Sequence, residues 1–402
     1  MSKKSLTAID IGSSKIATLV AGVGEEGEVR VLGTVTLPSK GIKRGQIVNI
    51  EEAVTAITSS VEAAERMAGL SLSQAVVSIG GAQIASQNSK GVVAVARPEG
   101  EITSEDVRRV IEAARAVSLP SSREILHVIP RYYIVDGQEG VRDPVGMSGV
   151  RLEVETHLIT GSGPAARNLV KCLDEVGIGV RELVMGGLAA AESVLTETEK
   201  ELGVVLVDIG GGTTSVVVFV EGAPFYSVVL PVGARNVTND LAIGLRLSLE
   251  EAEKMKIDLA KGEGEEDEKK RKMLVEGIIR PRLNEIFELV GEEIKKSGAA
   301  GLTPAGLVVT GGGAQTPGVI ESAKRMLAMA ARIGQPSGLV GLVDEIQSPD
   351  LAVAAGLLLL GVKKEGFRRE GFSLEKWGKK LPKLPVKGLI IKLIDLIKSL
   401  LP

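Results

Sequence analysis

Two stretches of sequence with one shared pattern decide the fold of this chain. Residues 6–14 read LTAIDIGSS, and residues 204–214 read VVLVDIGGGTT. Each starts as an apolar run typical of a buried strand and passes through an aspartate into a turn of glycine and small hydroxyl residues. Two further strand-like segments follow each turn: Ile16–Val23 and Val29–Leu37 after the first, Val216–Val220 and Phe225–Leu230 after the second. We therefore predict a three-stranded meander at each place.

The correspondence between the two halves continues beyond the meanders. Each meander is followed by a helical stretch, a short strand and a glycine cluster: Ile50–Met67, Ala75–Ile79 and Gly80–Gly81 in the first half, Val275–Lys296, Gly306–Thr310 and Gly311–Gly313 in the second. The recurrence of these features in the same order predicts an internal duplication. We expect two similar α/β lobes that face each other across a cleft.

Two stretches without a counterpart interrupt the duplication. Residues 82–161 combine strand-like Gly91–Ala96, a helical segment Ser104–Val117 and strand-like Ile125–Val135, so we predict a small inserted α/β subdomain. Residues 237–299 form a second interruption, with a run of alternating charge blocks between Gly262 and Lys272. Such a run is typical of a solvated loop.

The composition is that of a globular protein from a reducing compartment. The 402 residues are 44% hydrophobic and 25% charged, which fits a chain with more than one domain. Aromatic residues amount to only 2%, so we predict no nucleic-acid partner that stacks bases on aromatic rings. Cys172 is the single cysteine, and His127 and His157 are the two histidines. These three side chains are too few ligands for a thiolate–imidazole metal cage. Neither a secretion signal nor a membrane-spanning run is found, so we expect a cytosolic chain.

The two aspartate turns have the composition of a nucleotide site. Glycines let backbone N–H groups approach an anion closely, and the hydroxyls add donors. Asp10 and Asp208 end the preceding strands, where carboxylates would repel bound phosphates unless a hard cation lay between, so we predict Mg²⁺ there. The alternative is that each aspartate only ends a strand and caps a turn. The candidate phosphate-binding residues are Gly12, Ser13, Ser14, Gly210, Gly211, Gly212, Thr213 and Thr214.

A third glycine cluster adds a weaker signal. Gly311, Gly312 and Gly313 follow a short strand and lead into a helical segment, Pro317–Met329. A helix N-terminus with an open backbone can receive a phosphate or lie against a flat base. The alternative is a strand-to-helix turn that requires positive φ angles.

These motifs resemble those of the superfamily that contains actin, sugar kinases and the heat-shock chaperone ATPases. Within it the chain is similar to the FtsA family of bacterial cell-division proteins. The resemblance covers nearly the whole chain and rests also on residues 187–196 (GLAAAESVLT), 233–240 (GARNVTND) and 252–256 (AEKMK). It implies duplicated, ribonuclease H-like lobes around a nucleotide cleft, with an inserted small subdomain and a C-terminal amphipathic helix.

The resemblance also implies domain boundaries. The first lobe would comprise residues 1–81 and 162–202, around the insertion at 82–161. The second lobe would comprise a core at 203–236 and 300–345 and an outer subdomain at 237–299. A return helix at 346–362, a cationic linker at 363–386 and a membrane-binding helix at 387–402 would follow.

The resemblance further implies roles for individual residues. The two turns would hold the phosphates of ATP, together with Lys15, and Asp10 and Asp208 would position Mg²⁺. Glu253 and Lys256 would touch the ribose or base, and Gly311, Gly312 and Gly313 would face the adenine. Hydrolysing relatives place a water-orienting Glu or Gln near the position of Gly186, and Glu192 lies too far along the helix to replace it. We therefore expect ATP binding with slow hydrolysis, if any.

The tail has physical properties of its own. Lys363–Pro402 carries eleven Lys or Arg residues against four Asp or Glu, a net charge of +7 in a chain of net charge −3. From Lys387 to Leu401 one helical arc would hold Leu389, Ile390, Leu393, Ile394, Leu396, Ile397, Leu400 and Leu401. Such a helix, about 22 Å long, is too short to span a bilayer but suits its anionic interface. A core helix that packs back on the globular part is the alternative.

The resemblance implies a cytoskeletal adaptor on the cytoplasmic face of the membrane at the division site. Such a protein would self-associate into filaments and bind the C-terminal peptide of the tubulin-like protein FtsZ through residues 237–299. Later division proteins would be further partners. Two alternatives stay open: a PilM-like pilus-assembly adaptor, and a small-molecule kinase of the same superfamily, for which no catalytic base can be assigned.

Overall fold

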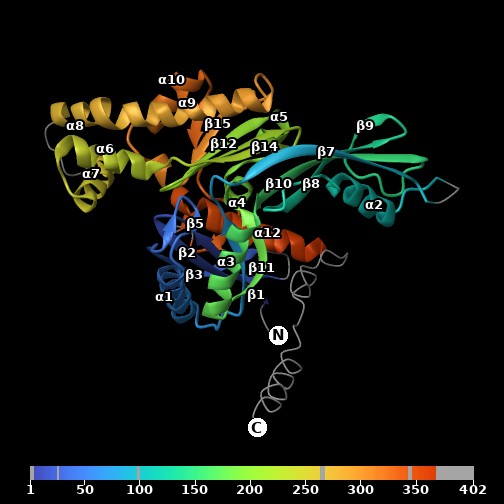
Figure 1. Cartoon of the computed structure of the whole chain (residues 1–402), viewed down its shortest axis with the longest axis horizontal. Helices are drawn as coiled ribbons and strands as arrows, with labels where there is room; N and C mark the ends of the chain where they lie inside the picture. Colours follow the sequence, from blue (N-terminus) through green and yellow to red (C-terminus); the bar gives the residue numbers. More distant parts are fainter. Residues whose placement is uncertain (1–3, 25–26, 97–99, 263–267, 343–345, 368–402) are drawn as a thin grey trace, which may run out of the picture. The chain divides into compact units, whose positions relative to one another are not determined.

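The computed structural model describes residues 4–24, 27–96, 100–262, 268–342 and 346–367 (Figure 1). The chain divides into two compact units, Met1–Lys364 and Glu365–Pro402, and all strands of the described residues lie in the first. The expected membrane helix at 387–402 and the expected linker from residue 368 onward lie outside the described residues. Within the described part of the chain, no helix is both long and apolar enough to cross a membrane.

The first lobe is built on a six-stranded sheet with the order β11-β6-β1-β2-β3-β17. Its strands are β1 (Lys4–Ile11), β2 (Lys15–Val23), β3 (Val29–Pro38), β6 (Gln74–Ile79), β11 (Gly179–Met185) and β17 (Val340–Gly341). β1, β2 and β3 form an antiparallel meander, and β6 and β11 extend the sheet in parallel. A short hairpin follows β3, with strands β4 (Ile42–Lys43) and β5 (Gln46–Ile47).

The second lobe repeats this arrangement with the order β14-β13-β12-β15-β16. Its strands are β12 (Val204–Ile209), β13 (Thr214–Val220), β14 (Ala223–Leu230), β15 (Leu307–Thr310) and β16 (Ala331–Ile333). β12, β13 and β14 are antiparallel, and β15 and β16 are parallel to β12, as β6 and β11 are to β1. The predicted duplication of two α/β lobes is therefore confirmed.

Amphipathic helices cover the outer faces of both sheets. On the first sheet lie α1 (Ile50–Ala68) and α3 (Gly163–Val176), which bury Ile57 and Leu173 in one core with Ile9. On the second sheet lie α9 (Arg280–Ser297) and α10 (Val319–Leu327), which bury Phe287 and Ala323. In each helix the buried residues recur at the spacing of one helical face, so burial of that face stabilises the helix.

Two helices join the lobes. α4 (Gly186–Val194) and α12 (Ala352–Phe367) lie in one core with side chains of both sheets, among them Leu19 and Val217. Their backbones touch, because a Cβ at Gly356 would lie 1.7 Å from the carbonyl oxygen of Ala189. α12 continues to Phe367, beyond Val362, where the return helix was expected to end. α5 (Glu197–Leu202) leads from α4 into β12.

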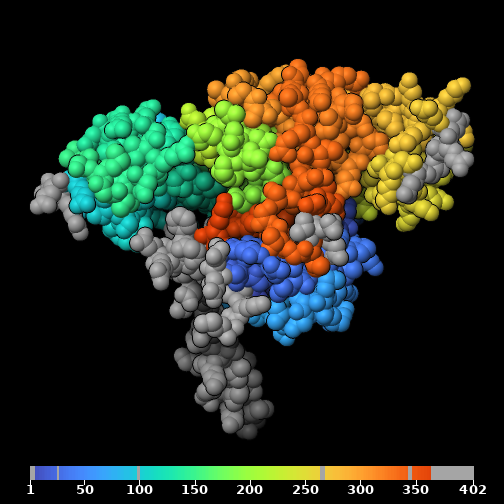
Figure 2. Space-filling view, turned by 180° about the vertical axis from the view of Figure 1, so that it is seen from behind, coloured from blue at the N-terminus to red at the C-terminus, as the bar shows by residue number. Residues whose placement is uncertain are grey.

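An outer helical group extends the second lobe. It consists of α6 (Ala234–Leu245), α7 (Leu249–Lys261), α8 (Glu268–Leu274) and the π-helical turn η1 (Val275–Ile279), which leads into α9. Figure 2 shows this group in yellow, projecting beyond α9 and α10. The sequence predicts one continuous helix from Val275 to Lys296, but its first turn is π-helical. This turn lies just before Pro281, whose ring carries no N–H for the helical ladder.

The insertion forms its own four-stranded antiparallel sheet with the order β7-β10-β8-β9. Its elements are β7 (Ala85–Ala94), α2 (Ser104–Arg115), β8 (Arg123–Val135), β9 (Gln138–Val141) and β10 (Arg151–Ser162). Thr103 caps α2 in a reciprocal capping box with Asp106. The sequence predicts a strand at Gly91–Ala96, whereas β7 already starts at Ala85. Its polar first half is held by pairing with β10 rather than by local apolar character.

The insertion is fastened to strand β14 of the second lobe. The backbone N–H of Ser227 donates to Ser86 Oγ at 2.8 Å. His157 is fully buried between Asn88 Oδ1, 2.8 Å from its Nδ1, and Ser227 Oγ, 3.0 Å from its Nε2. Burial, together with the charge of Arg131, lowers the pKa of His157 to about 3, so the ring is neutral. His157 is thus a hydrogen-bonded structural residue.

Candidate functional site

The two aspartate turns meet at the boundary between the lobes. In the first turn Gly12 N donates to the Lys15 carbonyl at 3.0 Å, and in the second Gly210 N donates to the Thr213 carbonyl at 2.8 Å. A Cβ at Gly211 would lie 1.8 Å from Ser14 Oγ, so the two turns could not approach this closely with any other residue there. The structure therefore brings the predicted phosphate-binding turns together.

Two buried carboxylates lie behind the turns. Asp208 is 9% exposed, and burial together with the charge of Asp10 raises its pKa to about 7. Burial also raises the pKa of Asp10, although the hydroxyl of Ser78 donates to its Oδ1 at 2.7 Å and Lys15 lies near. Two buried carboxylates with raised pKa values, of which Asp10 raises that of Asp208, favour a cation between them.

The chemistry of these carboxylates fits Mg²⁺. Mg²⁺ is usually held by one or two carboxylates, with waters and substrate phosphates as its other ligands. Among the residues that the structure describes, no group of three or more His, Cys, Asp or Glu side chains could hold a metal by itself. A cation at Asp10 and Asp208 would therefore depend on a bound phosphate for further ligands.

Lys15 connects the first turn to the start of α12. Its Nζ donates to the Asp350 carbonyl at 2.5 Å and also pairs with the Asp350 carboxylate. Burial opposes ionisation of Asp350, but Lys15 and Ser348 outweigh it and lower its pKa. Asp350 lies in the short helix η3 (Pro349–Leu351). Lys15 is thus held by an anion at the inner end of the site.

The third glycine cluster closes the site beside Asp208. Gly311 has a φ of +82°, and a Cβ there would lie 2.3 Å from Asp208 Oδ1. Its N–H donates to the Pro349 carbonyl at 3.0 Å. Gly312 and Gly313 lie in the short helix η2 (Gly312–Gln315), and α10 begins at Val319 rather than at Pro317. Gly311 thus starts a strand-to-helix turn with a positive φ and also lies beside the carboxylate of Asp208.

Glu253 and Lys256 lie on α7 and connect to the second turn through α6. Lys256 Nζ donates to Glu253 Oε2 at 2.7 Å and to Thr238 Oγ1 at 2.9 Å. At the start of α6 the N–H groups of Ala234 and Arg235 donate to the carbonyls of Gly210 and Gly211, at 2.9 and 2.8 Å. The second turn therefore caps α6, on which α7 packs.

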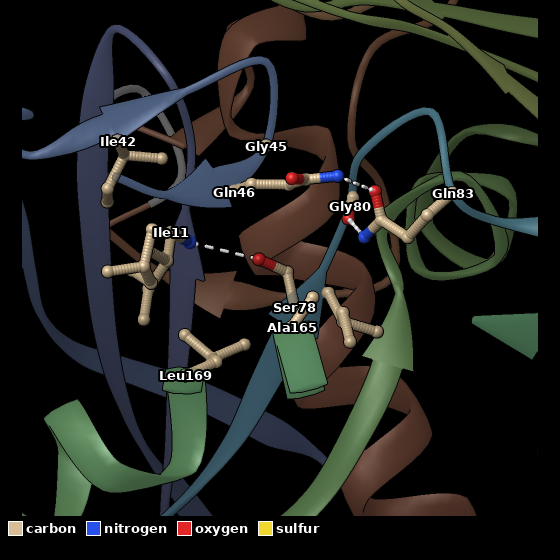
Figure 3. Close-up of a pocket in the computed structure, with 11 residues that line it drawn as sticks. Ile11, Ile42, Gly45, Gln46, Ser78, Gly80, Gln83, Ala165 and Leu169 are labelled. Carbon is tan, nitrogen blue, oxygen red and sulfur yellow. Dashed lines mark hydrogen bonds between the residues drawn. The ribbon is translucent and has the colours of Figure 1, made fainter. Parts of the chain in front are cut away.

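Figure 3 shows a small pocket under the first turn, between β1, β6 and α3. Ile11 N donates to Ser78 Oγ at 2.9 Å, and Gln83 Nε2 donates to the Gly80 carbonyl at 2.7 Å (Figure 3). Its space admits about one water, so it cannot hold a nucleotide. The pocket matters to the site through one lining residue, Ser78, which hydrogen-bonds both the backbone of Ile11 and the carboxylate of Asp10.

Ser78 and Asp350 are the site residues that sequence reasoning missed. Ser78 lies at the end of the predicted strand Ala75–Ile79, directly before the first glycine pair, and its hydroxyl in an apolar strand was the available signal. Asp350 lies far along the chain from Lys15, and no local pattern connects the two.

Comparison with known proteins places the chain in a family. A family model described as the SHS2 domain inserted in FtsA matches residues 81–160, and a second, described as cell division protein FtsA, matches residues 205–356. FtsA of Pseudomonas aeruginosa is 41% identical over 406 residues, covering 96% of both chains. The chain belongs to the FtsA family. FtsA of Borreliella burgdorferi is 38% identical, covering 92% of this chain and 94% of its own, and that of Escherichia coli K12 is 35% identical, covering 94% and 97%.

Membership in the FtsA family confirms the resemblance drawn from the sequence and makes the chain an actin-like cell-division protein. Solved structures agree on the fold. The PilM–PilN pilus biogenesis complex matches with a TM-score of 0.66 at 17% identity, covering 89% of this chain and 98% of the other. MreB5 of Spiroplasma citri bound to ADP matches with a TM-score of 0.52 at 14% identity, covering 92% and 99%. At these identities the likeness concerns the fold alone, so family membership favours cell division over the pilus and kinase alternatives.

Proposed function

We propose that this FtsA-family chain binds ATP with Mg²⁺ between its two aspartate turns. The observation that carries the proposal is the contact of the two glycine turns directly beside the acidic pair. Backbone N–H groups of both turns are thereby near one place, as an anion requires. MreB5 was solved with ADP and with AMPPNP, and its shared fold supports a nucleotide here.

Different residues would bind the phosphates, the metal ion and the nucleoside. Gly12–Ser14 and Gly210–Thr214 would hold the phosphates, and Asp10 and Asp208 would hold Mg²⁺, which neutralises phosphate charge when bound. Lys15 would exchange the Asp350 carboxylate for a phosphate oxygen. Glu253, Lys256 and Gly311–Gly313 would lie toward the ribose and the base.

Hydrolysis is expected to be slow. Gly186, the first residue of α4, has no side chain that could orient an attacking water. The carboxylate of Glu192, further along the same helix, is paired with Lys200 at 3.5 Å and with Lys363. In-line phosphoryl transfer without an oriented water loses an important part of its rate.

Electron microscopy on lipid monolayers with ATP and Mg²⁺ tests the nucleotide proposal. We expect filaments from the unmodified protein and from the control Asp174→Ala, which changes an exposed aspartate on α3. Asp208→Ala should form none and should bind a fluorescent ATP analogue at least tenfold more weakly. Unchanged ATP affinity in Asp208→Ala would remove the basis of the proposal.

We further propose that the chain tethers FtsZ to the cytoplasmic face of the membrane. The outer helical group, residues 237–299, would bind the C-terminal peptide of FtsZ, and the insertion would serve later division proteins. Four large apolar side chains of the outer group are exposed: Ile243, Leu249, Ile257 and Met273. Ile243 is the most exposed of them, at 78%. The tail would supply the contact with anionic lipid.

A pair of surface variants tests the docking of FtsZ. Ile243→Glu should weaken binding of a synthetic FtsZ C-terminal peptide at least tenfold, since it places a charge in an apolar contact. Val150→Glu, which changes a 70% exposed residue on the insertion, should leave that affinity unchanged. Equal effects of the two variants, or no effect of Ile243→Glu, would place the peptide elsewhere.

A further inference from the structure

An open groove adjoins the first turn, separate from the acidic end of the site. The loop between β3 and α1 forms one wall, the start of α1 a second, and Arg235 of α6 the third. Ser13 and Ser39 line it together with Lys40 and Lys43. Residues of both lobes thus line one groove.

Hydrogen bonds connect this groove to both aspartate turns. Ser39 N donates to the Ser14 carbonyl at 3.0 Å, and Gly45 N donates to Ser13 Oγ at 2.8 Å. On the opposite side, Arg235 N donates to the Gly211 carbonyl at 2.8 Å. A group bound in the groove would therefore lie directly beside the place where the two turns meet.

The loop that forms the groove is tightly fixed. Gly41 and Gly45 both have φ of +71°, and Arg44 between them has φ of +48°, which is unusual for a residue with a side chain. A Cβ at Gly41 would lie 2.3 Å from the Asn49 carbonyl oxygen, and one at Gly45 would lie 2.5 Å from Gly81 N. The groove is thus preorganised rather than a gap beside a loose loop.

The charges and polar atoms of the groove favour an anion. Lys40, Lys43 and Arg235 line it, and no ion pair joins them to any carboxylate of the described residues. Ser39 Oγ is buried and has no hydrogen-bond partner among the described residues. Glu52 is the one acidic side chain among the lining residues, so cations exceed it by two. Several donors and an excess of positive charge match a compact dianion.

We propose that this groove binds inorganic phosphate released from the nucleotide, next to ADP held between the turns. The inference rests on the proposed ATP site, whose hydrolysis would consume one water and yield ADP, inorganic phosphate and a proton. Ser13 belongs both to the first turn and to the groove, so a phosphate that leaves the turns reaches Lys43 and Arg235 next. The groove thus retains the product and makes its release a separate step.

Titration of inorganic phosphate into the ADP-loaded full chain, followed by phosphorus NMR, tests the groove. We expect Lys43→Ala and Arg235→Ala each to weaken phosphate binding about tenfold with ADP affinity unchanged, because only a charged hydrogen bond is lost. Ser39→Ala, which keeps all charges, should weaken it less. Lys324→Ala, a change of an exposed lysine on α10, is the matched control and should have no effect.

Further outcomes of the titration, and a vesicle experiment, distinguish a failure of this inference from a failure of the proposed ATP site and from binding of a lipid headgroup. If ADP does not bind, the ATP proposal fails, but phosphate binding to the nucleotide-free chain that depends on Arg235 would still support the groove. If ADP binds and phosphate does not, or the variants leave phosphate affinity unchanged, the groove inference is overturned. It is overturned as well if Lys43→Ala and Arg235→Ala weaken only sedimentation with vesicles of anionic lipid, because the groove would then hold a lipid headgroup.

Discussion

Asp208 is a residue whose place favours function over stability. Its carboxylate is buried beside Asp10, and the raised pKa means that the charged form is disfavoured in the folded state. Asp208→Asn keeps the size of the side chain and removes the charge. We expect the variant to be more stable at pH 8, by on the order of a few kcal/mol, and to lose the Mg²⁺-dependent part of its ATP affinity.

The pH dependence provides the control for Asp208→Asn. Because the pKa of Asp208 is higher in the folded protein, this carboxyl lowers the free energy of unfolding as pH rises from about 4 toward 7. The stability gained by Asp208→Asn should therefore be full at pH 8 and absent below pH 4. Urea denaturation of both proteins across this range measures it. A destabilised variant at pH 8 would show that the charge of Asp208 is compensated in the folded protein.

Gly186 offers a test of why turnover should be slow. A Cβ at this position would lie 3.7 Å from Val353 Cγ1, an ordinary contact, so a Cβ fits there. Gly186→Gln adds an amide at the position where the resemblance to the superfamily implies a water-orienting residue. We expect phosphate release to accelerate at least tenfold with ATP affinity unchanged. Gly186→Ala adds the Cβ without a polar group and should leave the rate as it is. Equal rates in all three proteins would contradict this account of slow turnover.

The contact between the insertion and β14 has a predictable pH response. His157 has a pKa of about 3 in the folded chain, against an ordinary value of 6.5, so its contribution to stability is full above pH 6.5. That contribution is lost progressively as pH falls from 6.5 toward 3, because the unfolded chain takes up the proton more readily. His157→Gln should flatten the stability profile over this range, as measured by urea midpoints.

Ser86→Ala is the matched control for His157→Gln. It removes the hydrogen bond from Ser227 N but no titratable group, so it should lower the free energy of unfolding by about 1–3 kcal/mol equally at pH 5 and pH 8. If both variants change the profile alike, His157 is not the group that titrates.

At the scale of elements, the sequence predicts what local pattern determines. The strands of both meanders and the helix Ile50–Ala68 follow from apolar periodicity, and the helix is closed by Asn49 at one end and Gly69 at the other. The first half of β7 escapes prediction because its residues are polar and become a strand only by pairing with β10. The same holds for the site: the glycine turns are local, whereas the partners Ser78 of Asp10 and Asp350 of Lys15 come from distant segments.

At the scale of the whole molecule, duplication explains why the site lies where it does. Each half presents one aspartate strand end, and α4 and α12, packed between the sheets in one core, hold the two ends face to face. A shared core of this kind also means that the lobes cannot separate without exposing apolar surface. The fold alone does not decide the biological role, since the pilus protein PilM shares it at 17% identity. We therefore expect the features that distinguish this chain from PilM to lie outside the shared lobes, first of all in the C-terminal tail.

The tail is the attachment that we expect to contact the membrane. Lys363–Pro402 carries a net charge of +7, and residues 387–401 would, as a helix, present an apolar arc suited to a membrane interface. Deletion of residues 387–402 should abolish sedimentation with vesicles of anionic lipid and leave ATP affinity unchanged, since residues 1–364 form a compact unit of their own. The full-length double variant Leu393→Glu, Ile397→Glu keeps the linker cations and should also lose binding, whereas raised salt alone should only weaken it. Vesicle binding that survives both changes would mean that the cations, not the apolar arc, hold the protein on the membrane.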